Sequence, residues 1–167
     1  AQSTARDPLP AKLAFMLLPH PASGEDVQDD MDMVVALGIY TEHWMLVKHA
    51  FPGIHNCCID VASAFRRESD EDPRGSGFDP HTRSRIREKR TWPVVWEVAM
   101  SVLNKFGFLI ALCNHGRHRS LSLAYELSAF RAGCWLVSMR DPDRPSEKLD
   151  PNDVLDFIAP RLVRHLD

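Results

Sequence analysis

The apolar and polar positions of residues 108–131 follow a pattern typical of a strand, a turn and a helix. The apolar run FLIALC has the length of a strand and ends at Cys113. A polar stretch around Gly116 follows, and apolar residues from Leu121 to Phe130 then recur at helical spacing, so we expect them to pack the helix against the core. We expect the rest of the chain to be organised around this unit.

Apolar patterns on both sides of this unit predict further elements. The expected helices begin at capping or acidic residues and carry apolar residues at helical spacing, whereas the expected strands are short apolar runs. Helices are expected over residues 25–37 with Gly38 as the stop, 42–50 after the N-cap Thr41, 92–106 with Gly107 as the stop, and 151–167 after the N-cap Asp150, and strands over residues 54–61 and 134–139. Strands that alternate with helices predict an α/β fold of three layers with a short, mostly parallel sheet.

The size and composition of the chain are those of a single domain. It has 167 residues, of which 44% are hydrophobic and 26% are charged. We expect one domain over residues 1–167, with a loose lead-in over residues 1–10 and a mobile loop over the charged, proline- and glycine-containing residues 66–79.

Charge and cysteine content narrow the class of protein. A formal net charge of -3 gives no global attraction to nucleic acid or to an anionic membrane, so RNA would need a local basic patch. No apolar run approaches the roughly 18 residues that span a bilayer. The four cysteines make a poor disulfide framework and lack the spacing of a zinc site. We expect a protein of a reducing compartment, the cytoplasm, without a metal or other cofactor.

The polar turn after the central strand combines residue types that bind anions. The helix that follows begins with N–H groups that have no partner inside the helix, at the positive end of its dipole. An arginine beside them can present a planar fork to two phosphate oxygens. We therefore expect a phosphate, free or esterified, to bind the turn formed by Cys113, Asn114, His115, Gly116, Arg117, His118, Arg119 and Ser120.

A purely structural explanation of the same residues stays open. Cys113 can be a small apolar residue that closes a buried strand, and Gly116 can be an ordinary turn glycine. The two arginines can be the solvated start of a helix. The combination of all these residue types within eight positions nevertheless favours the phosphate site.

The turn from Cys113 to Ser120 resembles the phosphate loop of the RapZ C-terminal domain family, written C-x-G-G-x-H-R-S. His115 stands where that motif has its first glycine. Two weaker similarities support the resemblance, which covers about residues 54–141. Asp60 and Val61 match the first two positions of a D-V-R motif at a strand end, with Ala62 in place of the arginine. Arg140 and Asp141 match the last two positions of an H-R-D motif, with Met139 in place of the histidine.

This resemblance implies a sensor or adaptor that binds a phosphosugar such as glucosamine-6-phosphate, and also small regulatory RNA. Backbone amides of residues 114–119 would hold the phosphate, Arg119 would clamp it, and His118 would supply a further donor. Asp60, Arg140 and Asp141 would orient the rest of the ligand. From the sequence alone, Asp60 can equally be a cap at the end of its strand.

The same turn also satisfies the looser C-x5-R-S pattern of cysteine-dependent phosphatases. Cys113 would then be the nucleophile, and Arg119 would hold the phosphoryl oxygens. The histidine that usually precedes the cysteine is replaced by Leu112, and the triplet that begins at Trp92 lacks the acid of the phosphatases' W-P-D loop. Asp70, Asp72 and Asp79 are the candidate acids, and the sequence does not choose among them.

A run of basic residues lies upstream of the turn. If residues 80–90 form a helix, Arg83, Arg87 and Arg90 share one face and make a stripe that can contact RNA phosphates. A solvated helix surface is the alternative explanation. Oligomers, which the RapZ resemblance implies, would bring the stripes of neighbouring subunits together.

Overall fold

The computed structural model describes residues 32–66, 75–131, 134–142 and 144–166. Within these ranges the strands are β1 (Met33–Gly38), β2 (Cys58–Asp60), β3 (Phe108–Cys113) and β4 (Trp135–Ser138). They form a four-stranded sheet in the order β2-β3-β1-β4, in which all neighbouring strands are parallel. The predicted α/β fold is confirmed, and all four strands have their carboxyl ends at one edge of the sheet.

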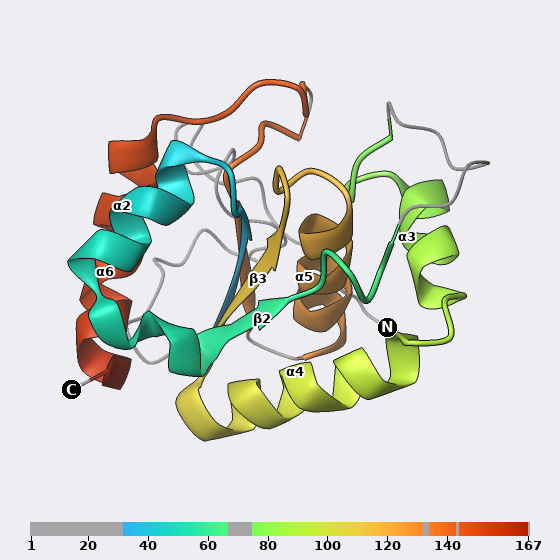
Figure 1. Cartoon of the computed structure of the whole chain (residues 1–167), viewed down its shortest axis with the longest axis horizontal. Coiled ribbons are helices and arrows are strands. Elements are labelled where there is room, and N and C mark those ends of the chain that lie inside the picture. The colour runs from blue at the N-terminus through green and yellow to red at the C-terminus, as the bar shows by residue number, and fades with distance from the viewer. Residues whose placement is uncertain (1–31, 67–74, 132–133, 143, 167) are drawn as a thin grey trace, which may run out of the picture.

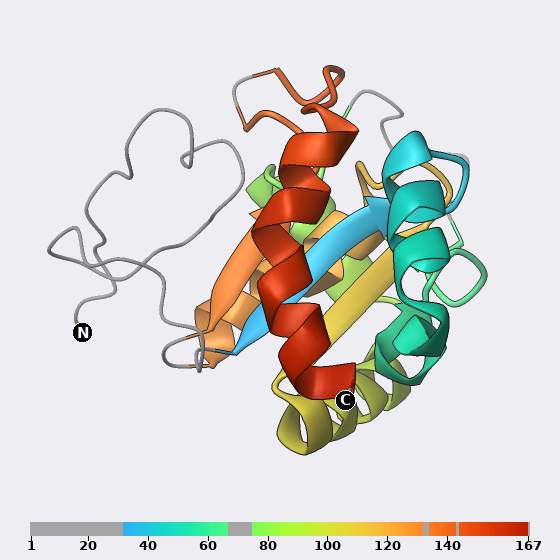
Figure 2. The ribbon, with the colours of Figure 1, turned by 90° about the vertical axis from the view of Figure 1, so that its left-hand side faces the viewer.

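Helices cover both faces of this sheet and complete the three layers (Figures 1 and 2). One face packs against α2 (Glu42–Ala50), the 3-10 helix η2 (Pro52–Cys57) and α6 (Pro151–Leu166). The other face packs against α3 (Pro80–Arg87), α4 (Trp92–Phe106) and α5 (Arg119–Phe130).

The order of the strands explains which helix lies on which face. From β1 to β2 the chain moves in one direction across the sheet, and from β2 to β3 and from β3 to β4 it moves in the other. Because connections between parallel strands are right-handed, the first must cross one face and the other two must cross the opposite face. The neighbouring strands β1 and β3 therefore send their connections to different faces, and such a divergence leaves a crevice at the carboxyl edge.

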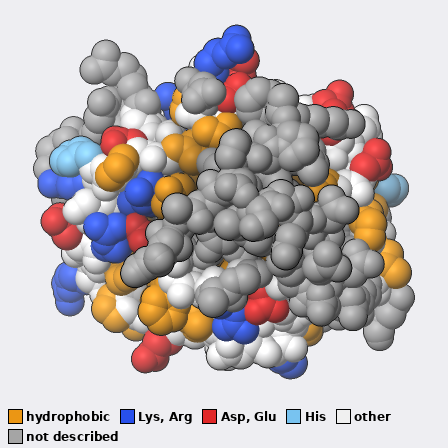
Figure 3. Space-filling view, turned by 180° about the vertical axis from the view of Figure 1, so that it is seen from behind, with side chains coloured by type: hydrophobic (Ala, Val, Ile, Leu, Met, Phe, Trp, Pro, Cys, Tyr) orange, Lys and Arg blue, Asp and Glu red, His pale blue; other side chains and the backbone are white. Residues whose placement is uncertain are grey.

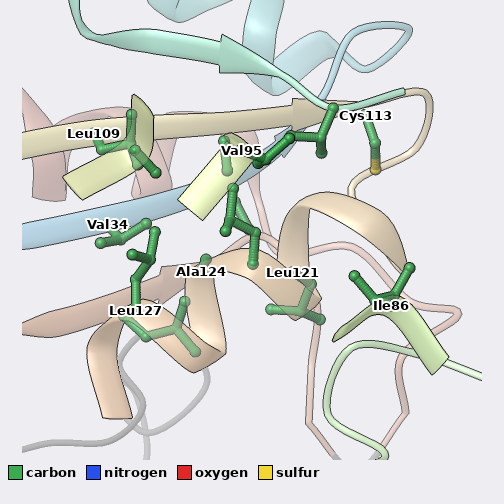
Figure 4. Close-up of a cluster of buried hydrophobic side chains, with 14 of the residues drawn as sticks. Val34, Ile86, Val95, Leu109, Cys113, Leu121, Ala124 and Leu127 are labelled. Atoms are coloured by element: carbon green, nitrogen blue, oxygen red, sulfur yellow. The ribbon is translucent and has the colours of Figure 1, made fainter. Parts of the chain in front are cut away.

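The two central strands, β1 and β3, are buried along their whole length. Alternate side chains enter different clusters, so Val35 and Leu37 lie with α2 and α6, whereas Val34 and Ala36 lie with α4 and α5. Figure 4 shows part of the second cluster, in which Leu121, Ala124 and Leu127 of α5 pack toward the sheet. Burial on both faces is the reason that these strands are continuous apolar runs in the sequence.

Several predicted element ends are confirmed. Thr41 is the N-cap of α2, and its hydroxyl accepts the N–H of Trp44 at 3.4 Å. Gly107 ends α4 in the left-handed conformation, with φ of 69°, which glycine adopts at little cost. Asp150 precedes α6 and accepts the N–H of Asn152 at 2.8 Å.

The helix predicted over residues 25–37 is wrong for the part that the structure describes. Met33–Gly38 is the strand β1, paired on both sides. Acidic residues in front of an apolar run imitate the first turn of a helix, but the run Met33–Leu37 is short and is buried on both faces, as a central parallel strand requires. Gly38 therefore ends a strand and not a helix.

Three further expectations need correction. The strand predicted over residues 54–61 is only Cys58–Asp60, because η2 occupies Pro52–Cys57. The helix predicted over residues 80–90 ends at Arg87, so Arg90 lies beyond the helical face that it was expected to share with Arg83 and Arg87. Phe130, an expected contact of its helix with the core, is 69% exposed.

The lead-in at residues 1–10 and residues 67–74 of the predicted mobile loop lie outside the described residues. In the part of the chain that is described, we find no helix with both the length and the apolar character needed to cross a bilayer.

Candidate functional site

The loop between β3 and α5, residues 113–120, lies beside the turn that follows β1. Ile39 donates its N–H to the carbonyl of Cys113 at 2.7 Å, and Tyr40 donates to the carbonyl of Asn114 at 3.1 Å. On the other side, Val61 donates to the carbonyl of Leu112 at 2.8 Å. The loop thus begins at the carboxyl edge of the sheet, between the ends of β1 and β3, which is the edge where an open parallel sheet binds its ligands.

Three more carbonyl groups of the loop are bound to the surrounding structure. His115 accepts from Nη2 of Arg140 at 2.7 Å, Arg117 accepts from the N–H of Gly77 at 2.8 Å, and His118 accepts from the N–H of Ser122 at 2.9 Å. Because N–H and C=O point in opposite directions in a trans peptide, carbonyls that face the scaffold leave the amides facing the inside of the loop.

The inside of the loop therefore carries hydrogen-bond donors. The amide of Gly116 donates to Sγ of Cys113 at 3.3 Å. Within the described residues we find no acceptor for the amides of Asn114, His115 and Arg119. These donors, at the amino end of α5, form an environment suited to an anion.

Two glycines allow the loop to pass against the end of β1. A Cβ atom on Gly38 would lie 2.5 Å from the carbonyl carbon of His115 and 2.8 Å from the nitrogen of Gly116. Gly116 has φ of 69°, and a Cβ atom on it would lie 2.8 Å from Sδ of Met139 and 2.9 Å from the nitrogen of Gly38. Backbone contacts of this kind leave no room for a side chain at either position.

Cys113 is both a core residue and a hydrogen-bonded member of the loop. Its side chain belongs to the apolar cluster between the sheet and α5, near Leu121 (Figure 4), and the residue is 2% exposed. Its sulfur lies 3.1 Å from Oγ of Ser120, which is also buried. The sulfur thus has two hydrogen-bond partners inside the loop, the Gly116 amide and the Ser120 hydroxyl.

Arg140 is only 6% exposed and holds the backbone of the loop at His115. Besides the carbonyl of His115, its guanidinium donates to the carbonyl of Ser146 at 3.0 Å. Burial, and then the positive charge of Arg117, lower the pKa of Arg140, while Cys113 acts in the opposite direction. Arg140 thus holds the backbone of the loop in place, and the role in orienting a ligand that the RapZ resemblance implies for it stays a prediction.

Arg119 and Asp60 lie beside the mouth of the loop. Nη1 of Arg119 donates to the carbonyl of Ala62 at 2.6 Å, and we find no other acceptor for this guanidinium among the described residues. The exposed Asp60 accepts the N–H of Ala62 at 2.9 Å. Asp60 therefore caps the end of β2, which is one of the two roles that the sequence left open.

The remaining predicted ligand residues differ in exposure. His115 is exposed, and Asn114, Arg117 and His118 are partly buried. Asp141 is 7% exposed and follows Arg140 in the segment of residues 139–149. Of the candidate acids, Asp79 is the N-cap of α3 and accepts from the His81 N–H, whereas Asp70 and Asp72 lie outside the described residues.

Residues 139–142 and 144–149, here called the strap, contain Arg140 near one end and contact His43 of α2 at the other end. Leu149 donates its N–H to the carbonyl of Met139 at 2.8 Å, and the carbonyl of Leu149 lies 2.6 Å from Nε2 of His43. His43 is buried in α2, and burial is the main reason that its pKa is lowered. The charges of Lys148 and Arg140 lower this pKa further, whereas the Leu149 carbonyl and Glu42 raise it.

The basic residues of α3 are held by α5. Arg83 lies 3.4 Å from Glu126, stacks over Tyr125 at 3.8 Å, and donates to the carbonyl of Phe78 at 2.7 Å. Arg87 also pairs with Glu126. Figure 3, the view from behind, shows acidic and basic side chains next to one another on its left side. A role of Arg83, Arg87 and Arg90 in binding RNA remains a prediction.

Two residues near the loop were not identified as site residues from the sequence. Gly38 was taken for a helix stop, and Tyr40 was not considered. The signal for both would have been the assignment of β1 as the central neighbour of β3, because their contacts with the loop depend on that pairing.

The described residues hold no group of three or more His, Cys, Asp or Glu side chains that would bind a metal. The four cysteines are free thiols. In comparisons with known proteins, no family model, no curated protein and no solved structure matches this chain. The geometry of the loop therefore carries the functional argument.

We predict that Gly38→Ala destabilises the protein, because its Cβ atom would force the loop backbone to move. The expected loss is about 1–3 kcal/mol in the free energy of unfolding, measured by urea denaturation. Gly53→Ala is the matched control, since a Cβ atom there has nothing within 4 Å. Equal effects of the two substitutions would contradict the close packing of the loop on β1.

We also predict a loss of stability in mild acid that depends on His43. Its pKa is lower in the folded than in the unfolded protein, where it has its usual value near 6.5. The stabilisation is thus present above this value and is lost as the pH falls toward the folded-state pKa. Urea denaturation between about pH 7 and pH 5 should show a steeper loss for the native protein than for His43→Gln. Parallel curves would show that His43 does not titrate in this way.

Proposed function

We propose that this protein binds a phosphate-bearing small molecule in the loop of residues 113–120 and acts as a sensor or adaptor domain. The observation that carries the proposal is the orientation of the loop peptides. Five of its carbonyl groups are bound to the scaffold, so the corresponding amides point to the inside of the loop at the amino end of α5. Phosphate oxygens are the ligands that such a ring of donors fits best.

The charges around the loop support an anionic ligand. Arg117 and Arg140 are close enough for the charge of one to lower the pKa of the other. An anion placed inside the loop would relieve this repulsion. Arg119 keeps part of its guanidinium for such an anion after its bond to Ala62. A fork of this kind binds two phosphate oxygens at once.

The resemblance to the RapZ C-terminal domain suggests the kind of ligand. Its motif covers Cys113, Gly116, His118, Arg119 and Ser120, and its functional context is the binding of a phosphosugar. On this proposal the loop amides and Arg119 hold the phosphate, and the residues beside the crevice contact the organic part. RNA binding and assembly into oligomers would extend the same role.

Inorganic phosphate should raise the melting temperature of the protein, because it would bind the folded state only. Arg119→Ala should weaken this binding at least about tenfold, the effect of losing one charge-assisted hydrogen bond. Arg144→Ala removes the same charge from an arginine whose side chain is 70% exposed, and serves as the control. Potassium chloride at equal ionic strength separates binding from screening. A melting temperature that phosphate leaves unchanged would refute the proposal.

Hydrolysis of a phosphate ester is the second candidate function, and the surroundings of Cys113 favour it. The Gly116 amide and the Ser120 hydroxyl both lie within hydrogen-bond distance of the Cys113 sulfur, the atom that would act as the nucleophile. The thiolate would attack phosphorus and form a P–S bond as the P–O bond to the leaving group breaks. The leaving oxygen would take up a proton, and water would then release phosphate from the phosphocysteine and regenerate the thiol.

An aryl phosphate with a nitrophenolate leaving group tests this candidate, since that leaving group needs little help from an acid. If the protein is a phosphatase, Cys113→Ser should abolish hydrolysis and retain the rise in melting temperature with phosphate. Ser120→Ala should slow turnover with less effect on binding. Absence of hydrolysis by the native protein under reducing conditions would exclude this candidate and leave the binding function.

A further inference from the structure

Tyr40 is an exposed aromatic residue at the edge of the crevice between β1 and β3. It is 73% exposed, the largest value among the exposed large hydrophobic residues of the described chain. It lies in the turn between β1 and α2, next to the start of the loop that leads into α5. Its position is therefore set by the same divergence of connections that forms the crevice.

The backbone holds Tyr40 in a fixed place relative to the loop. Its N–H donates to the carbonyl of Asn114 at 3.1 Å. The next residue, Thr41, is buried as the N-cap of α2 and donates its hydroxyl to the carbonyl of Gly38 at 2.7 Å. The exposure of the ring is thus combined with a backbone that is bonded on both sides.

The ring of Tyr40 also lies next to the ring of His115, the exposed side chain of the loop. The ring centroids are 6.0 Å apart, with an interplanar angle of 52°. The backbone of His115 is fixed in turn by the bond from Arg140. Two aromatic side chains from two different segments therefore lie next to one another beside the loop.

We infer that Tyr40 determines the specificity of this site by stacking on a flat aromatic ring of the bound phosphate ester. This inference rests on the proposed phosphate binding. The loop would hold the phosphate, and the exposed face of the Tyr40 ring would stack on a ring attached to that phosphate. Aromatic side chains stack on nucleobases and aryl groups in this way. A nucleobase and a simple aryl group share this chemistry. An aliphatic phosphate would use the loop alone.

Phosphonates test the inference without interference from hydrolysis, because a thiolate that attacks phosphorus cannot displace the carbon of their C–P bond. Calorimetric titration of the full chain would compare methylphosphonate, cyclohexylphosphonate and phenylphosphonate. We expect phenylphosphonate to bind at least about fivefold more tightly than methylphosphonate, the contribution of one stacking contact. Cyclohexylphosphonate should fall between them, because its ring is apolar but not flat.

Variants of Tyr40 identify the residue responsible. Tyr40→Ala should bring the ratio of phenylphosphonate to methylphosphonate affinity close to one, whereas Tyr40→Phe should keep it. Met45→Ala, which removes another exposed apolar side chain from α2, should not change the ratio. Uridine 5′-monophosphate and phenyl phosphate, titrated against Cys113→Ser, then separate a nucleobase from an aryl group as the preferred ring.

Each other outcome counts against the inference in a different way. Equal affinities for all three phosphonates would refute the role of Tyr40 and leave the phosphate site intact. Equal affinities for the phenyl and cyclohexyl compounds would show that any apolar ring suffices and that stacking is not used. If neither phosphate nor any phosphonate binds, the proposed function fails, and the inference fails with it.

Discussion

The contact between the end of β1 and the loop after β3 is the constraint on which the candidate site depends. At Gly38 and Gly116 the two backbones approach so closely that neither position has room for a side chain. This contact holds the loop against the central strand and leaves its carbonyls within reach of donors from three other segments. The loop is therefore shaped mainly by backbone contacts, and its exposed and partly buried side chains contribute little to holding it in place.

The sheet topology explains why this contact occurs where it does. β1 and β3 are neighbours whose connections leave toward opposite faces, so the turns that follow them meet at the carboxyl edge of the sheet before the chain diverges. There Ile39 and Tyr40 donate their N–H groups to the carbonyls of Cys113 and Asn114. Arg140, at the end of β4, reaches the loop because β4 is parallel to β1 and ends at the same edge. One arrangement of strands thus brings together residues from distant parts of the chain.

The sequence predicted the elements whose apolar pattern is regular. The strand Phe108–Cys113 and the helix Trp92–Phe106 were predicted with the bounds that the structure has, because one is a continuous apolar run and the other ends at a left-handed glycine. β1 was taken for a helix, since its short apolar run follows acidic residues. The error had consequences for the site. Without β1 beside β3, neither the contact of Gly38 with the loop nor the position of Tyr40 could be predicted from the sequence. The contact of Arg140 with the loop could not be predicted either, because it is a hydrogen bond between residues 25 positions apart.

The strap also determines the order in which the site can form during synthesis. The whole loop motif leaves the ribosome before Arg140, which follows His115 by 25 positions. The carbonyl of Ser146, which holds the other side of the Arg140 guanidinium, emerges later still. A nascent chain that ends after α5 would therefore contain every residue of the motif without the anchor for its central peptide. The backbone of the loop is therefore fully anchored only after the last strand of the sheet and the segment behind it have been made.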